Sequence, residues 1–153
     1  MKKIICLALA GVLLAAAVLL TACRKEADQL QNGYYTAEVA EFDSHGWKEY
    51  VTIYVRENKI VTVEYNAKNP TGFIKSWDMN YMATMAAVAG TYPNEYTRVS
   101  AAQLLAGQGE KPIDGISGAS HSRKSFRLLA LAVIEQAKTG DTSVKHVVVP
   151  EDE

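Results

Sequence analysis

Apolar and polar residues alternate along the chain after residue 32, with the two-residue period of strands that bury one face. The first such segment covers residues 34–42 and is followed by a turn cluster at 43–46. A second alternating segment covers 50–55, and the tight turn at 57–59 leads into a third at 60–65. The pattern therefore predicts an antiparallel meander of three strands.

The spacing changes to a helical one after residue 72. One predicted helix carries apolar residues largely on one face and is ended by Pro93; these residues are Ile74, Trp77, Tyr81, Met82 and Met85. The methionines of this segment, Met79 among them, are interpreted as helix packing. A second helix is expected to start at an Asn94 cap and to run to about Ala106, where Gly107 ends it. Its predicted apolar stripe consists of Val99, Ala102, Leu105 and Ala106.

A third helix is predicted from about Ser122 to Lys138, with Gly140 as its stop. Its apolar stripe is the strongest of the three and is expected to pack across the sheet; it consists of Phe126, Leu129, Ala130, Val133, Ile134 and Ala137. The remaining segment, 143–153, is either an edge strand or a tail. Strands grouped early and helices grouped late predict an α+β fold, a small antiparallel sheet packed against helices.

The N-terminal segment has the composition of a lipoprotein signal peptide at residues 1–22. A basic start precedes an apolar stretch at 4–20, and the sequence Leu-Thr-Ala before Cys23 resembles a lipobox. Cys23 is therefore the predicted lipidation site, with residues 23–32 as a polar tether and the bilayer as its partner. The alternative is an uncleaved membrane anchor, for which 17 residues are at the short limit. Either way the domain, predicted at 33–142, is tethered outside the cytoplasm.

Charge and cysteine content narrow the class of function. The formal net charge of −1 argues against a nucleic-acid partner, because such domains usually show a basic face. The two cysteines are Cys6, inside the signal peptide, and Cys23, so the mature domain has no thiol for a disulfide or a thiolate metal site. The three histidines do not have the spacing of a metal site, and none is predicted.

A small, hydroxyl-rich loop at residues 114–122 precedes the third helix. Ser120 or Ser122 can cap a helix that begins near Arg123. The unpaired N–H groups of a helix start also favour an anion, so a phosphate held at Ser120 would gain from Arg123 and Lys124. Read from the residues alone, the loop is either an attachment site or an ordinary capped turn.

The same loop resembles the flavinylation motif of the FMN-binding domain family, whose members are covalently flavinylated electron-transfer lipoproteins. The motif reads Asp, two variable residues, Ser or Thr, Gly, Ala, and the Thr or Ser that carries FMN. Here these positions are Asp114, Ser117, Gly118, Ala119 and Ser120. The likeness extends to 125–130 and 137–141 and upstream to 43–48, so it covers most of the chain after residue 32. The chain departs from the pattern in having Ser where Thr is the usual acceptor.

The resemblance implies that FMN is attached to Ser120 through a phosphoester, with Asp114 and the Ser117 to Ala119 run as recognition residues. It also implies a flavin transferase that loads FMN from FAD, a membrane redox partner, and an extracytoplasmic location. The protein would then be an electron carrier rather than a stand-alone enzyme. Trp47 follows a turn in which a large apolar residue has little local reason to sit, so it is a candidate lining residue of the flavin site.

Two alternatives remain at this point. One is a surface lipoprotein of the same fold without flavin, acting as a binding or immunogenic module. The other is reversible FMN binding without a covalent bond.

Overall fold

The structure, a computed structural model, describes residues 29–114 and 117–150. The predicted signal peptide, Cys23 and most of the tether lie outside these residues. The elements are β1 (Gly33–Val39), β2 (Lys48–Arg56), β3 (Lys59–Lys68), the 3-10 turn η1 (Lys75–Trp77), α2 (Met79–Ala89), α3 (Pro93–Gly107), α4 (Ser120–Thr139) and β4 (Lys145–Val147).

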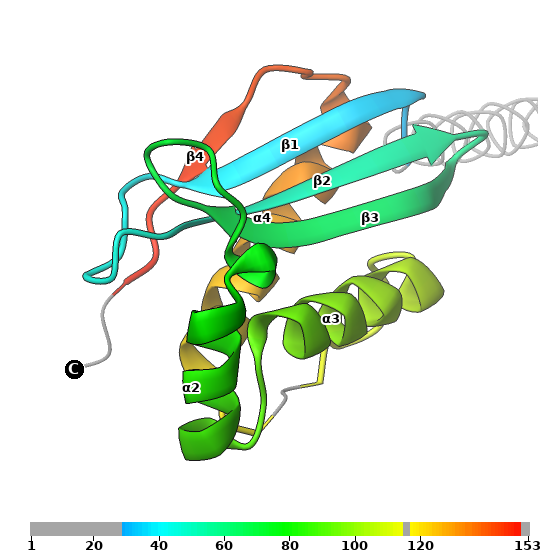
Figure 1. Cartoon of the computed structure of the whole chain (residues 1–153). Helices are drawn as coiled ribbons and strands as arrows, with labels where there is room; N and C mark the ends of the chain where they lie inside the picture. The colour runs from blue at the N-terminus through cyan, green and yellow to red at the C-terminus, as the bar shows by residue number, and fades with distance from the viewer. Residues whose placement is uncertain (1–28, 115–116, 151–153) are drawn as a thin grey trace, which may run out of the picture.

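The sheet has the strand order β3-β2-β1-β4, and Figure 1 shows α4 lying behind it. β1 and β2 pair antiparallel, as do β2 and β3, which confirms the predicted meander. The C-terminal segment forms an edge strand, the first of the two alternatives for 143–153. β4 pairs parallel to β1, so the sheet is mixed and not purely antiparallel as expected. β4 runs in the same direction as β1 because α4 carries the chain back across the sheet before β4 begins.

The hydrophobic core lies between the sheet and α4. The apolar stripe predicted for this helix is confirmed, since Phe126, Leu129, Val133 and Ala137 are fully buried and Ile134 is packed at the edge of the core. They face the inward side chains of β1 and β2, which are Tyr35, Ala37, Val51, Ile53 and Val55. Full burial of each large apolar side chain contributes roughly 1.5–3 kcal/mol, so this layer dominates the stability of the fold.

The start and the buried face of α3 differ from the prediction. The helix begins at Pro93 behind Tyr92, while the side chain of Asn94 accepts a hydrogen bond from Arg98 Nε at 2.6 Å instead of capping the helix. The predicted stripe of Val99, Ala102, Leu105 and Ala106 is exposed. The buried face contains Tyr96, Thr97, Ser100 and Leu104. Because several residues of this buried face carry hydroxyl groups, the pattern of apolar residues in the sequence does not reveal it.

The segment predicted as one packed helix is divided at Asp78. This residue ends η1 and caps α2, since its carboxylate accepts from Tyr81 N at 2.9 Å. No residue of α2 is buried, and Met79 is 72% exposed, so the interpretation of Met79 as packing is wrong. Trp77 is 65% exposed and also lies outside the core. The helix projects from the body of the domain beside α3 (Figure 1).

The first turn of α4 starts two residues earlier than predicted. Its N-cap is Ala119, which offers no side-chain hydrogen bond, so neither Ser120 nor Ser122 caps the helix. At the other end Gly140 adopts a positive φ of 74° and terminates the helix as predicted.

The predicted tether enters the domain at the C-terminal end of α4. Gln31 N donates to Ala137 O at 2.8 Å, and Gln31 Nε2 donates to Lys138 O at 3.1 Å. Ser120 starts the opposite end of this 20-residue helix, which is about 30 Å long at 1.5 Å per residue. The fold therefore separates the entry of the tether from the predicted attachment loop. None of the helices within the described residues has the length and apolar content of a membrane span.

A buried acid on the other face of the sheet gives a first prediction. The Glu38 carboxylate accepts from Lys68 Nζ at 2.7 Å and lies 3.7 Å from Lys48 Nζ and 3.5 Å from His146 Nδ1, so it links β4 to the sheet. Burial opposes its ionisation, but the hydrogen bond and charge of Lys68 and then the charge of Lys48 outweigh burial and hold the pKa of Glu38 below its usual value of 4.5. A lowered pKa means that the stabilisation is present above pH 4.5 and is lost as the pH falls through the folded-state value.

We expect Glu38→Gln to lower the free energy of unfolding at neutral pH by about 1.5–3 kcal/mol, the usual contribution of hydrogen bonds to a charged group. The difference from the wild type should shrink as the pH falls below 4.5. Urea denaturation at neutral and at acidic pH measures it. A difference that stays constant with pH would show that the charge of Glu38 contributes nothing.

Candidate functional site

Ser120 lies at the mouth of a cavity of about 460 Å³. It is the first residue of α4 and is exposed, whereas Ala119 before it is buried. The cavity is lined by residues 42–45, by η1, α2 and α3, by the loop before α4, and by the first turn of α4. Its walls include Phe42, His45, Lys75, Tyr81, Met85, Tyr96 and His121. The predicted acceptor hydroxyl therefore opens onto a pocket of the size that small cofactors occupy.

Gly118 holds the attachment loop against the end of α2. It has a φ of +80°, and a Cβ built on it would lie 2.2 Å from the carbonyl oxygen of Ala89. Thr91 Cγ2 would lie 3.2 Å from the same atom. Only glycine combines this backbone conformation with such a close approach, so the glycine of the motif has a structural reason in this fold.

Lys75 brings a positive charge to the cavity. Its side chain is 5% exposed, and its Nζ lies 4.7 Å from the ring centroid of Tyr81 and 5.7 Å from that of Trp47. Lys75 was not among the predicted site residues, because a single lysine in a predicted amphipathic helix carries no signal until the fold brings it to the cavity. The cavity is thus lined both by this buried lysine and by the first turn of α4, whose unpaired N–H groups also favour an anion.

Trp47 is buried and packs edge-on against Tyr81, with ring centroids 6.1 Å apart. It lines a second cavity of about 550 Å³, which shares Phe42, Asp43 and His121 with the cavity at Ser120. The fold thus places Trp47 at the candidate site and gives it a packing role. Whether it contacts a flavin stays a prediction.

Glu49 is a residue of the site that the sequence analysis missed. It is 6% exposed and occupies an inward position of β2, where the alternation of the strand predicts an apolar side chain. Its carboxylate accepts from Ser122 Oγ at 2.7 Å, from Tyr65 OH at 3.1 Å and from Ser125 Oγ. Its oxygens therefore bind both β3 and the first turns of α4.

Two buried tyrosines surround this carboxylate. Burial, and then the charge of Glu49, raise the pKa of Tyr65 well above its usual value. Burial is also the largest cause of the raised pKa of Tyr96, which Glu49 adds to and a hydrogen bond with Ser122 opposes. Both phenols therefore remain neutral at physiological pH and keep their protons as hydrogen-bond donors.

The rest of the motif lies at the surface. Asp114 is exposed, and its backbone N donates to Gln103 Oε1 at 2.8 Å. Ser117 is exposed in the turn before Gly118, while the two residues between Asp114 and Ser117 lie outside the described part of the chain. The carboxylate of Asp114 and the hydroxyl of Ser120 are both available to another molecule.

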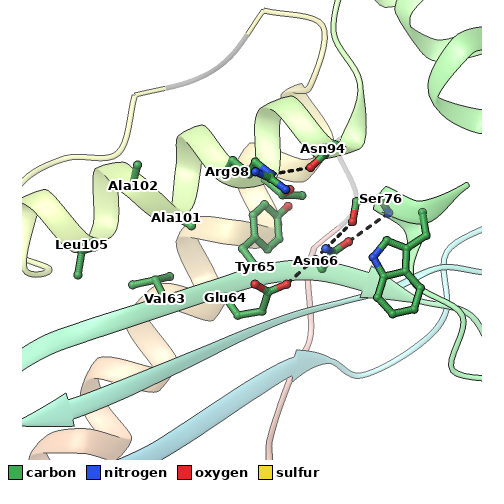
Figure 2. A pocket seen from close by; sticks show the side chains of 12 residues that line it. Val63, Glu64, Tyr65, Asn66, Ser76, Asn94, Arg98, Ala101, Ala102 and Leu105 are labelled. Carbon is green, nitrogen blue, oxygen red and sulfur yellow. Dashed lines mark hydrogen bonds between the residues drawn. The ribbon is translucent and has the colours of Figure 1, made fainter. Parts of the chain in front are cut away.

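A further cavity, of about 430 Å³, lies between β3 and α3 and is shown in Figure 2. Its polar groups are largely paired with one another, since Asn66 Nδ2 donates to Ser76 Oγ at 2.8 Å and Arg98 Nε donates to Asn94 Oδ1 at 2.6 Å. Exposed Trp77 lines this cavity and not the one at Ser120. None of the described residues of the 114–122 loop lines it. Within the described ranges, no group of three or more His, Cys, Asp or Glu side chains could hold a metal ion.

Comparisons with known proteins identify similar chains. The sequence is 34% identical over 128 residues to the 15 kDa lipoprotein of Treponema pallidum (strain Nichols), covering 84% of this chain and 89% of the relative. The crystal structure of the CPE2226 protein from Clostridium perfringens is 35% identical, with a TM-score of 0.75, and covers 80% of this chain and 100% of that chain. A solution NMR structure of a protein from Clostridium thermocellum matches at 29% identity and a TM-score of 0.46, over 76% of this chain and 96% of that one. No family model matches the chain.

Proposed function

The chain belongs to the family of the 15 kDa lipoprotein of Treponema pallidum, and from this premise we propose that it is a lipid-anchored, extracytoplasmic carrier of FMN. In this proposal FMN is bound covalently to Ser120, and the domain relays electrons between a membrane redox partner and an external acceptor. The relative's name supports the lipoprotein part of the proposal. The flavin part depends on the geometry around Ser120.

The observation that carries the flavin part is the exposed hydroxyl of Ser120 on the first turn of α4, at a cavity that also contains Lys75. This set of groups fits FMN: the helix N-terminus and the ammonium suit its phosphate, and apolar Phe42 and Met85 with the ring of Tyr81 suit its flat ring system. FMN, when bound, supplies reversible one- and two-electron transfer, while the protein sets its position and surroundings.

The hydroxyl oxygen of Ser120 is the atom of this chain that reacts in the proposed attachment. This Oγ loses a proton and forms a P–O bond to the FMN half of FAD, as the bond to the AMP half breaks and AMP leaves. A flavin transferase that supplies the rest of the site is the implied partner. A covalent bond suits a cofactor outside the cytoplasm, because a dissociated flavin would diffuse away.

The position of the tether supports a carrier role. The chain enters the domain at the C-terminal end of α4, beside Ala137 and Lys138, whereas Ser120 is at the N-terminal end. Ser120 is therefore about 30 Å from the anchored end, from the rise of the helix. A partner can approach it without displacing the tether.

The test is to export the protein together with a flavin transferase, purify it, denature it and desalt it. The proposal expects the visible absorption of flavin to stay with the denatured chain. Flavin that is removed by desalting would indicate reversible binding instead.

The second candidate is a surface lipoprotein without flavin. Two observations favour it: the relative's name mentions a lipoprotein and nothing else, and Ser stands where the motif usually has Thr. A colourless protein from the co-expression experiment would support this candidate against the carrier.

Asp114→Ala is expected to give a folded and largely colourless protein. Asp114 is exposed, and it donates to Gln103 Oε1 through its backbone N, so loss of the carboxylate should change the free energy of unfolding by about 0.5 kcal/mol or less. Its expected role is in recognition by the transferase. Thermal melting and flavin content measured together check this, and a destabilised variant that is fully flavinylated would refute it.

Cys23→Ala is expected to leave the precursor uncleaved or to release the protein from the membrane fraction. The thiol of Cys23 is the only acceptor for the diacylglycerol in the proposed maturation, and stable anchoring needs more than one acyl chain. Fractionation and N-terminal sequencing measure both effects. Normal cleavage with unchanged membrane association would contradict the assignment.

A further inference from the structure

We infer that Glu49 is a positioning residue of the attachment site: its buried carboxylate fixes the rotation of the first turns of α4 and so presents Ser120 to the cavity. The part of this inference that concerns flavin loading rests on the proposed function. The part that concerns the helix does not.

The burial of Glu49 needs a compensating interaction. It lies in β2 opposite Ala67 of β3 and two residues before fully buried Val51, among the inward apolar side chains of the strand. Removing a carboxylate from water is costly unless hydrogen bonds replace its hydration. A substitution by an apolar residue would avoid this cost, so the acid is expected to serve a purpose other than packing.

The hydrogen bonds come from three hydroxyl groups on two elements. Tyr65 donates from β3, and Ser122 and Ser125 donate from α4. A carboxylate offers about four acceptor positions, so these three donors satisfy most of them. Hydrogen bonds to a charged acceptor are the stronger kind, and they join the sheet directly to the first two turns of the helix.

The hydroxyl of Ser125 has other possible hydrogen-bond acceptors within its own helix. Its Oγ also lies 3.2 Å from His121 O and 3.4 Å from Ser122 O, the carbonyl oxygens to which a helical serine normally turns. The same Oγ also donates to the Glu49 carboxylate. Because a hydrogen bond to a charged acceptor is stronger than one to a neutral carbonyl, Glu49 is the favoured partner of this hydroxyl.

The consequence for Ser120 follows from helix geometry. At 3.6 residues per turn, Ser122 and Ser125 are about 60° apart around the axis, while Ser120 is about 160° from the first and 140° from the second. When both serines are held against β2, Ser120 therefore lies on the side of the helix that faces away from β2. Because Ala119 provides no side-chain cap, no local hydrogen bond of that kind fixes the start of the helix.

The test compares Glu49→Gln with Glu38→Gln. Both substitutions neutralise a buried acid of the sheet without a change in size, but Glu38 pairs with Lys68 on the face of the sheet opposite α4. Hydrogen exchange of the flavin-free proteins is measured first. We expect amides in the first two turns of α4 to exchange at least tenfold faster in Glu49→Gln, with the last turns unchanged, and no such change in Glu38→Gln.

Flavin loading by the transferase is measured next, on the same proteins at a temperature at which all are folded. We expect Glu49→Gln to lower the turnover rate of loading at least tenfold with little change in KM, because the exposed recognition surface is kept. Ser125→Ala should slow loading as well, and the double variant should be no slower than the slower single one, since both act through one network.

Equal loading rates of Glu49→Gln and the wild type, or equal slowing by Glu38→Gln, would overturn the inference. Faster exchange along the whole of α4 would also overturn it, because Glu49 would then be a general stabilising residue. A wild type that takes up no flavin would refute the proposed function, and the exchange data alone would then decide whether Glu49 fixes the start of α4.

Discussion

Ser120→Ala should abolish covalent flavin while leaving the fold intact. The hydroxyl of Ser120 is the atom that forms the phosphoester, and alanine has nothing to replace it. Because Ser120 is exposed at the start of α4 and caps nothing, its loss should change the free energy of unfolding by about 0.5 kcal/mol or less. Flavin absorption of the denatured, desalted protein and a urea denaturation curve measure the two parts of this result.

Ser122→Ala is the matched control. Ser122 is two residues away and half-buried, and its Oγ donates to Glu49 and not to the solvent. This variant should load more slowly but reach full covalent attachment after long incubation. A Ser122→Ala protein that never takes up flavin, beside a Ser120→Ala protein that does, would show that the acceptor is two residues from the predicted position.

Gly118→Ala should produce the largest loss of stability among the motif residues, on the order of 3 kcal/mol. An alanine at a φ of +80° is strained by roughly 1–2 kcal/mol. In addition its Cβ would lie 2.2 Å from the backbone oxygen of Ala89, so either the loop or the end of α2 must move. Because that movement displaces the loop that carries Ser120, loading should fall as well.

Gly72→Ala separates the effect of backbone strain from the effect of the close contact with Ala89. Gly72 has a similar φ of +84°, but a Cβ built on it meets nothing within 4 Å. It should therefore show the backbone strain alone, about 1–2 kcal/mol, and normal flavin loading. Urea denaturation gives both values, and equal losses for Gly118→Ala and Gly72→Ala would mean that the contact with Ala89 is unimportant.

The parts of the fold that the sequence predicts are those whose periodicity reflects direct contact with the core. The alternation through Val51, Ile53 and Val55 and the stripe from Phe126 to Ala137 are confirmed. The face of α3 could not be predicted in this way, because it is formed largely by Tyr96, Thr97 and Ser100. The hydroxyl of Thr97 donates to Pro93 O at 2.8 Å, so it can be buried although it looks polar in the sequence.

The candidate site also contains residues that the sequence can identify and residues that it cannot. The loop up to Ser120 is contiguous and can be recognised from a short pattern of small and hydroxyl residues. Lys75 and Glu49 come from η1 and β2, and each acquires its role only when the fold brings it to the start of α4. The one sequence signal that could have identified Glu49 is its spacing, because this acidic residue is in phase with the inward-facing apolar residues of the strand.

The most direct test of the central claim is a fragmentation mass spectrum of the peptide that carries Ser120, from wild-type protein exported together with a flavin transferase. Three serines of this segment, Ser117, Ser120 and Ser122, can be distinguished by their fragment ions. We expect an added mass of one FMN less one water, located at Ser120. An unmodified peptide, or the added mass at Ser117 or Ser122, would contradict it.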